Sequence, residues 1–179
     1  MKIFKTIALC LIATMSMAQE EIPTNEQSGK AEYKYSEEVP GLTADQLYDR
    51  GLAWVNKFYK NPNGVLKTRD KESGKLVGRA RFKLSKTDKK GNVNPNDGYV
   101  AYQITLQFKD GKYRYIIDGI RWEQGSYYDV SQWSDSTQAN YNKQVYTSYI
   151  AQAIKYFDTL SENLEDYMKV GEAKVEDDW

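Results

Sequence analysis

Histidine is absent from this sequence of 179 residues, and cysteine occurs once, as Cys10. The lack of histidine excludes Ser-His-Asp and Cys-His catalysis, histidine zinc sites and a histidine pH switch. One cysteine cannot form an internal disulfide, so packing must stabilise the fold. Any catalysis would depend on carboxylates, lysine, tyrosine or serine. We expect no catalytic residues, no metal site and no cofactor.

Long apolar runs are also scarce, and the one at the N-terminus is short. Two lysines precede an apolar run over residues 6–15, and small residues flank a cleavage position after Ala18. The run is shorter than the roughly 20 apolar residues that span a bilayer. We therefore predict that residues 1–18 are a signal peptide and that Cys10 is removed with it. The mature protein is expected in the periplasm or outside the cell, without a membrane span.

The rest of the chain has the length of one domain. Residues 19–31 are polar and lack apolar periodicity, which predicts a flexible spacer, and residues 167–179 are predicted to form a charged tail. Between them we expect a single α+β domain over residues 32–166. The formal net charge of the whole chain is zero, with 25 cationic and 25 anionic side chains, so global charge indicates no class of partner.

Two segments have helical periodicity. Thr43 and Gln46 have the spacing of a capping box, and the helix that they begin is predicted to end at Asn61-Pro62. A longer helix is predicted from an apolar stripe that runs from Val145 to Leu164. This second helix should lie across the sheet and pack beside the first one.

Alternating segments predict five strands, at residues 33–39, 65–70, 75–84, 99–109 and 112–122. Asp110-Gly111 suits a two-residue type I′ turn between the last two strands. That turn sets a register with one apolar side, pairing Phe108 with Tyr113, Leu106 with Tyr115 and Ile104 with Ile117, and one polar side, pairing Gln107 with Arg114 and Gln103 with Asp118. We expect an antiparallel sheet with both helices on one face, in the order strand, helix, four strands, helix.

Two segments resemble a known family. They are Leu-Tyr-Asp-Arg-Gly-Leu-Ala-Trp-Val at residues 47–55 and Lys-Asp-Gly-Lys-Tyr-Arg-Tyr at residues 109–115. The chain resembles a domain-of-unknown-function family with a TATA-binding-protein-like (TBP-like) fold, found in secreted Bacteroidetes proteins. The resemblance implies a fold and an envelope context, and it supplies no activity or site residues. We expect no nucleic-acid partner, because one fold hosts many functions and an exported protein rarely meets the genome.

A stripe of cations is the first candidate binding site. Alternation places Arg79, Arg81 and Lys83 on the polar side of their strand, and the preceding hairpin is predicted to add Lys67 and Arg69 to the same face. Such a face can bind an anionic ligand, such as a phosphorylated or uronic-acid glycan, a lipid headgroup or an acidic protein. The alternative is that these charges only keep an exposed sheet from pairing.

An aromatic loop over residues 123–137 and the strand end before it form the second candidate. It holds Trp122, Tyr127, Tyr128 and Trp133, whose rings can stack on sugars or anchor a protein interface. The alternative is that the rings fold back and cover the end of the sheet.

Two acidic features are weaker candidates. The loop at residues 92–98 has the alternating oxygens of some calcium loops but fails the EF-hand pattern, and turn chemistry explains it. Asp118, Glu123 and Asp129 are candidates for a glycosidase acid and base, although sequence does not establish their separation.

These observations favour an exported, non-enzymatic module that binds an anionic or glycan ligand through the open sheet face and the aromatic loop. One alternative is a protein-interaction or structural component of the cell envelope. Another is a histidine-free glycosidase that uses carboxylates. The identity of the ligand or partner and the oligomeric state stay open.

Overall fold

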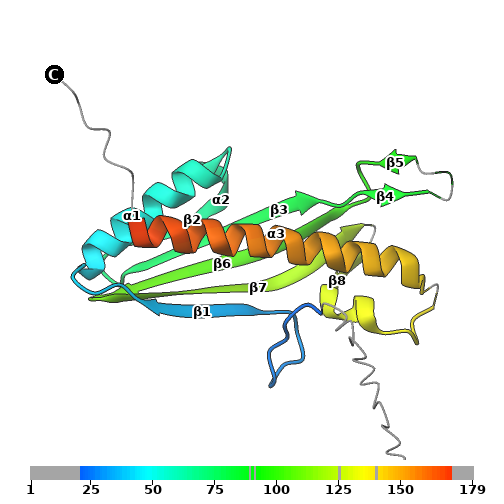
Figure 1. Ribbon diagram of the computed structural model, residues 1–179, viewed down its shortest axis with the longest axis horizontal. Helices are drawn as coiled ribbons and strands as arrows, with labels where there is room; N and C mark the ends of the chain where they lie inside the picture. The colour runs from blue at the N-terminus through cyan, green and yellow to red at the C-terminus, as the bar shows by residue number, and fades with distance from the viewer. Residues whose placement is uncertain (1–20, 89, 91, 125, 140, 171–179) are drawn as a thin grey trace, which may run out of the picture.

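The computed structural model describes residues 21–170, except residues 89, 91, 125 and 140 (Figure 1). The side chains of Ser126 and Tyr127 are also outside the described part. The predicted signal peptide, residues 1–18, lies outside the described residues. None of the described helices combines the length and apolar character needed to span a membrane.

The centre of the fold is a six-stranded sheet whose main path is β1-β7-β6-β3-β2, with all neighbours antiparallel. β8 continues the edge beyond β1, because both strands pair with β7 at different points along it. The strands are β1 (Tyr33–Glu38), β2 (Leu66–Asp70), β3 (Lys75–Lys83), β6 (Tyr99–Lys109), β7 (Lys112–Gln124) and β8 (Ser126–Asp129). β4 (Lys86–Thr87) and β5 (Val93–Asn94) form a separate small hairpin that projects from one end.

Helices α1 (Ala44–Phe58) and α3 (Lys143–Val170) lie side by side on one face of the sheet (Figure 1). The indole NH of Trp54 in α1 donates to the Asn163 side chain in α3 over 2.9 Å, which joins the two helices. Two short helices, α2 (Pro62–Val65) and the 3-10 helix η1 (Val130–Ser134), lie in the connections. The prediction of an α+β fold with both helices on one face is confirmed.

Local chemistry explains where the main elements begin. Thr43 and Gln46 form the predicted capping box at the start of α1. The Asp110 carboxylate accepts the Ala44 NH over 2.7 Å, so the β6–β7 turn is tied to the same helix end. Gly111 has a φ of 70°, as the predicted Asp-Gly turn requires.

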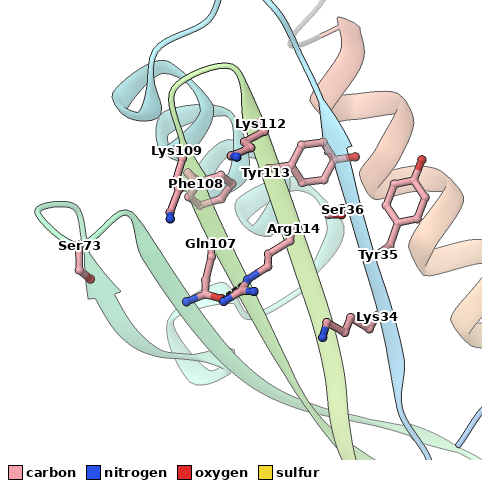
Figure 2. Close-up of a pocket in the computed structure, with 10 residues that line it drawn as sticks. All are labelled: Lys34, Tyr35, Ser36, Ser73, Gln107, Phe108, Lys109, Lys112, Tyr113 and Arg114. Carbon is pink, nitrogen blue, oxygen red and sulfur yellow. Dashed lines mark hydrogen bonds between the residues drawn. The ribbon is translucent and has the colours of Figure 1, made fainter. Parts of the chain in front are cut away.

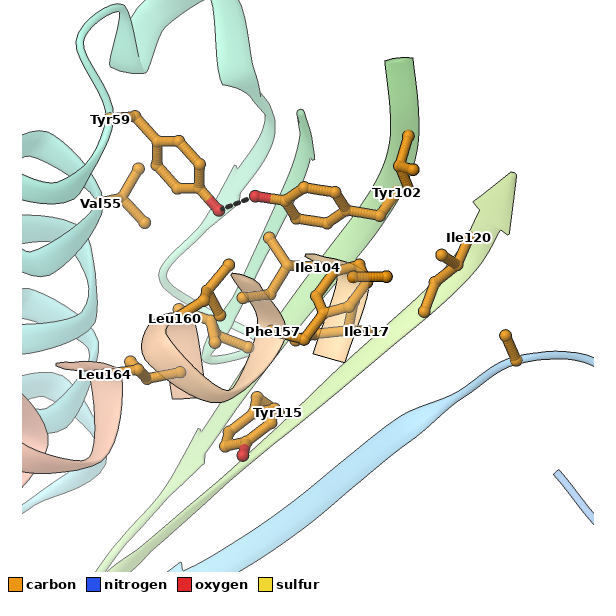
Figure 3. Close-up of a cluster of buried hydrophobic side chains, with 14 of the residues drawn as sticks. Val55, Tyr59, Tyr102, Ile104, Tyr115, Ile117, Ile120, Phe157, Leu160 and Leu164 are labelled. Carbon is orange, nitrogen blue, oxygen red and sulfur yellow. Dashed lines mark hydrogen bonds between the residues drawn. The ribbon is translucent and has the colours of Figure 1, made fainter. Parts of the chain in front are cut away.

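The core fills the space between the helices and the sheet. Phe157, Leu160 and Leu164 of α3 pack over the sheet residues Ile104 and Ile117, and all of them are buried (Figure 3). The register of the central hairpin is the predicted one, with the apolar pairs on the helix side and the polar pairs on the other. A bulge near Gly119 interrupts it once, and beyond the bulge the helix side continues at Ile120.

Three tyrosine hydroxyls in this core bond to one another in a chain. Tyr102 on β6 bonds through its hydroxyl to those of Tyr59 and Tyr156, at 3.0 Å and 2.8 Å. Burial is the main cause that raises the pKa of all three phenols above its ordinary value. The chain of hydroxyls therefore stays neutral at ordinary pH.

The ends of the domain differ from the sequence prediction. In the predicted spacer, Ile22 and Ala31 are buried, and the Ala31 NH donates to the Asp129 carboxylate over 3.1 Å. At the other end, α3 continues to Val170, so residues 167–170 are helical and Met168 is fully buried. The packed domain therefore extends beyond residues 32–166 at both ends, and residues 171–179 lie outside the described part.

Candidate functional site

The face of the sheet opposite the helices is called the open face here. Strand alternation places a second set of side chains on it, and neighbouring strands align them in rows across the sheet. Most of its charged groups are cations, on β1, β3, β6 and β7. They are Lys34, Lys75, Arg79, Arg81, Lys83, Lys109, Lys112, Arg114 and Arg121.

A hollow of about 540 Å³ lies on this face, at the end of the sheet nearest the β6–β7 turn. We call it the cationic hollow, since its side chains include four cations and no acid (Figure 2). The cations are Lys34, Lys109, Lys112 and Arg114; the polar neutral groups are Ser36, Ser73 and Gln107.

Register explains why these cations gather. The Asp-Gly turn sets Lys109 directly opposite Lys112, and Gln107 opposite Arg114. β1 then adds Lys34 from the other edge of β7, and the β2–β3 turn adds Ser73. Directly opposed like charges destabilise a sheet, so stability alone does not favour this arrangement.

The cations of the hollow are poorly neutralised by the protein. Among the described residues, no carboxylate forms an ion pair with any of the four. Glu38 is the register neighbour of Lys112 on β1, but it is not part of the lining. The Arg114 guanidinium donates one hydrogen bond to the Gln107 side chain, over 2.6 Å, which fixes its position while leaving its charge uncompensated.

The predicted stripe on β3 lies at the far end of the same face. Arg79, Arg81 and Lys83 are exposed there, as alternation indicates. The Arg81 guanidinium lies 4.3 Å from the centre of the Tyr99 ring and 3.8 Å from the Glu123 carboxylate. This stripe is therefore partly compensated by its own neighbours, unlike the hollow.

The prediction that Arg69 shares this face is wrong, and Lys67 has no strand partner. A bulge in β2 lets Leu66 pair with Gly78 and Thr68 with Val77, so Lys67 is the extra residue and Arg69 falls opposite Leu76, on the helix side. Arg69 donates to the Asn63 side chain over 2.6 Å, and the Lys67 ammonium donates to the Gly64 carbonyl over 2.6 Å.

The aromatic candidates pack into the end of the core below α3. Trp133 is fully buried, and half-buried Trp122 contacts Trp133, Tyr128 and Tyr149 with ring centroids 5.4 to 6.2 Å apart. The packing alternative therefore describes these rings, and the segment forms β8 and η1 instead of a loop. The backbone of Tyr127 pairs with Glu123, and its side chain lies outside the described part.

The acidic candidates are each engaged by neighbouring groups. Glu123 pairs with Arg81 and Arg121, and Asp129 accepts the Ser131 NH at the start of η1. Burial, with repulsion from Glu32, raises the pKa of the Asp118 carboxyl, while a hydrogen bond from Gln103 opposes the shift. In the calcium-like loop, Asp97 turns inward and accepts the Tyr149 hydroxyl.

An antiparallel sheet with helices on one face and the other face open defines the class of this protein as an α+β domain with a TBP-like fold. The chain belongs to the family described as a domain of unknown function (DUF4468) with TBP-like fold, whose profile matches residues 33–123.

Two solved structures share the fold. A DUF4468 family protein from Bacteroides ovatus ATCC 8483 is similar with a TM-score of 0.64 and 16% identity, covering 82% of this chain and 90% of the other. A TBP-like protein from Parabacteroides distasonis ATCC 8503 is similar with a TM-score of 0.64 and 14% identity, covering 82% and 96%. None of the curated proteins compared matches the chain. At these identities the likeness is one of fold.

Sequence reasoning missed the cationic hollow, although part of its signal was present. The Asp-Gly turn that pairs Gln107 with Arg114 also pairs Lys109 with Lys112, two residues nearer the turn. The position of β1 beside β7, which brings Lys34 to the same hollow, has no local signal because strand order is a long-range property.

Proposed function

We propose that this protein is an exported, non-enzymatic module that binds an anionic ligand in the cationic hollow of its open face. The observation that carries the proposal is a 540 Å³ hollow lined by four cations and by no acidic side chain. Export rests on the predicted signal peptide at residues 1–18. The binding role rests on charge, and the aromatic side chains at the other end of the fold serve packing instead.

The chemistry of the lining suits an anion with several oxygens. Lysine ammonium groups and an arginine guanidinium donate charge-assisted hydrogen bonds, which are roughly twice as strong as neutral ones. Ser36, Ser73 and Gln107 add neutral donors around the same hollow. No carboxylate lines the hollow, and its charged groups are cations, which suits binding of an anion; we therefore propose binding without turnover.

Charge removal within the hollow tests the proposal. The mature protein, residues 19–179, is titrated with oligogalacturonates and with inorganic pyrophosphate at low and at high salt, using neutral malto-oligosaccharides as the reference ligand. The test variant is Lys109→Gln/Lys112→Gln/Arg114→Gln. The matched control removes the same charge from exposed helix or turn positions, as Lys60→Gln/Lys143→Gln/Lys155→Gln.

Binding of an anion that weakens with salt is the expected result. A hydrogen bond to a charged group contributes about 1.5–3 kcal/mol, so the test variant should lose more than about tenfold in affinity, a change that corresponds to about 1.4 kcal/mol. The control variant should lose only the small part due to overall charge. Equal losses in the two variants, or no binding of either anion by the wild type, would refute the proposal.

A further inference from the structure

The open face carries a second group of cations, at a distance from the hollow. We call it the distal cluster: Arg79, Arg81 and Lys83 on β3, with Arg121 on β7. Arg81, Ala101 and Arg121 form one row across three strands, so the small Ala101 side chain leaves space between the two guanidinium groups. Glu123 pairs with Arg81 at 3.8 Å and with Arg121 at 3.3 Å, which leaves the cluster with excess positive charge.

The two groups of cations are aligned along the strands. Gln107 marks the row of the hollow on β6, and Ala101 marks the row of the distal cluster on the same strand. At about 3.4 Å per residue, these rows are about 20 Å apart. A small anion in the hollow therefore cannot reach the distal cluster, whereas an extended ligand can.

The surface between them is mostly uncharged and partly hydrogen-bonding. One row holds Ile116, Thr105 and Val77 on β7, β6 and β3 and reaches Lys34 of the hollow on β1, and the next row contains Gln103 between Asp118 and Arg79. Asp118 is the acid of this stretch, and its carboxyl has a raised pKa because it is partly buried. Helices α1 and α3 lie on the opposite face of the sheet, so neither of them covers the surface between the hollow and the distal cluster (Figure 1).

We infer that the ligand is a linear, acidic polysaccharide that lies along the open face and contacts the hollow and the distal cluster at once. The inference rests on the proposed function and specifies its ligand class. Amide and hydroxyl side chains such as Gln103, Gln107 and Thr105 can bond to sugar hydroxyls between the charged ends.

The same face fits other polyanions less well. Single-stranded nucleic acid is held by aromatic side chains on which bases stack. Tyr35, Phe108 and Tyr113 line the hollow from strand positions that face the helices. Among the described side chains that alternation places on the open face, Tyr99 is the aromatic one, and Arg81 and Lys83 already lie near its ring. An acidic peptide would bind better with apolar pockets for its other side chains. The apolar residues of this surface, Val77 and Ile116, are half-buried and no described hollow surrounds them, so they offer no such pocket.

Simultaneous contact at two places makes affinity depend on ligand length. Once one end is bound, the second contact forms within the same complex and its effective concentration is high. Ligands too short to span about 20 Å use the hollow alone. Affinity should therefore rise steeply at the length that first reaches the distal cluster and change little beyond it.

The experiment is a titration of the mature protein with size-fractionated oligogalacturonates, from the monomer to chains long enough to cover the face. Three proteins are compared: the wild type, the hollow variant Lys109→Gln/Lys112→Gln/Arg114→Gln, and the distal variant Arg79→Gln/Arg81→Gln/Lys83→Gln. Circular dichroism and the melting temperature check that each variant is folded. Poly-L-glutamate of matched charge number is the peptide probe.

For the wild type, long chains should bind at least about a hundredfold more tightly than short ones, the low end of what linked contacts add. The distal variant should lose this gain while keeping its affinity for short chains. The hollow variant should bind short chains poorly.

Different failures have different meanings. If short and long chains bind the wild type equally, or if the distal variant keeps the gain, the extended-ligand inference is overturned and the proposed function stands. If poly-L-glutamate binds more tightly than the matched oligogalacturonate, the polysaccharide assignment is overturned in favour of an acidic protein. If no anion of any length binds, both proposals fall.

Discussion

Gly51 lies where α1 approaches the sheet most closely, and replacing it with alanine tests how tightly the two layers pack. A Cβ atom at this position would meet the Phe108 ring of β6, with Cε1 at 2.9 Å and Cζ nearer still. Phe108 is only 3% exposed and packs edge-on against the Tyr48 ring, so moving its ring away would disturb this packing. Glycine is therefore required here by a close approach, on a helix that would otherwise favour alanine.

Two opposed effects set the magnitude. Gly→Ala inside a helix normally stabilises by about 1 kcal/mol, whereas forcing a methyl group into a packed core costs about 1–3 kcal/mol. Gly51→Ala should therefore destabilise the protein by up to about 2 kcal/mol, with a fall in melting temperature of about 2–4 °C for each kcal/mol. Urea unfolding followed by circular dichroism measures the free energy directly.

A double-mutant cycle identifies the cause. Phe108→Leu shortens the side chain that the new methyl group would meet, so Gly51→Ala should cost less in that background than in the wild type. Ala53→Gly, on the same helix, calibrates the helix propensity at about 1 kcal/mol. If Gly51→Ala raises stability, or if its effect is the same with and without Phe108, the close-packing argument is refuted.

Three further outcomes follow from the packing. Trp133→Ala should cost about 3–5 kcal/mol of unfolding free energy, because its ring is fully buried, yet leave anion affinity unchanged in a titration of the folded variant. Burial raises the pKa of Tyr59 and Tyr102, so the stability that their neutral phenols contribute is complete below the unfolded pKa of about 10 and is lost as pH rises above it. An alkaline titration should show their tyrosinate absorbance appearing together with loss of circular dichroism, and ionisation without unfolding would contradict this. Deleting Lys67, the extra residue of the β2 bulge, should cost less than about 1 kcal/mol of unfolding free energy. Deleting Val77 from β3 should prevent folding, because every later side chain of that strand would change face. Equal melting temperatures for the two deletion variants would contradict the register.

The sequence predicts best those elements whose signal is local. Asp110-Gly111 sets a turn and a register within a single hairpin, and the capping box sets the start of α1, so both are found in the structure as predicted. The end of α3 was predicted too early, because the stripe of Leu160 and Leu164 continues to Met168 among charged residues that suggested a tail. At this end of the chain, the spacing of apolar residues predicts where the helix ends better than the polarity of the segment does.

The candidate site could be predicted only in part, since it depends on contacts between distant segments. Alternation within β3 places Arg79, Arg81 and Lys83 on the open face without reference to any other strand. The cationic hollow instead needs β1, β6, β7 and the β2–β3 turn to meet, and no local pattern determines that β1 joins the sheet beside β7.

The bulge in β2 shows how a single residue decides which cations belong to the site. An uninterrupted strand that buried Leu66 would turn Thr68 and Asp70 toward the helices as well. With Lys67 as an extra residue, Leu66 stays buried while Thr68 and Asp70 turn to the open face, and Arg69 moves to the helix side. In the sequence, Leu66 is apolar, whereas Thr68 and Asp70, which an unbroken strand would place on the same side, are polar. This change indicates a break in the alternation. Because β2 is an edge strand, the break is tolerated, and the cations of the open face lie mainly on β1, β3, β6 and β7.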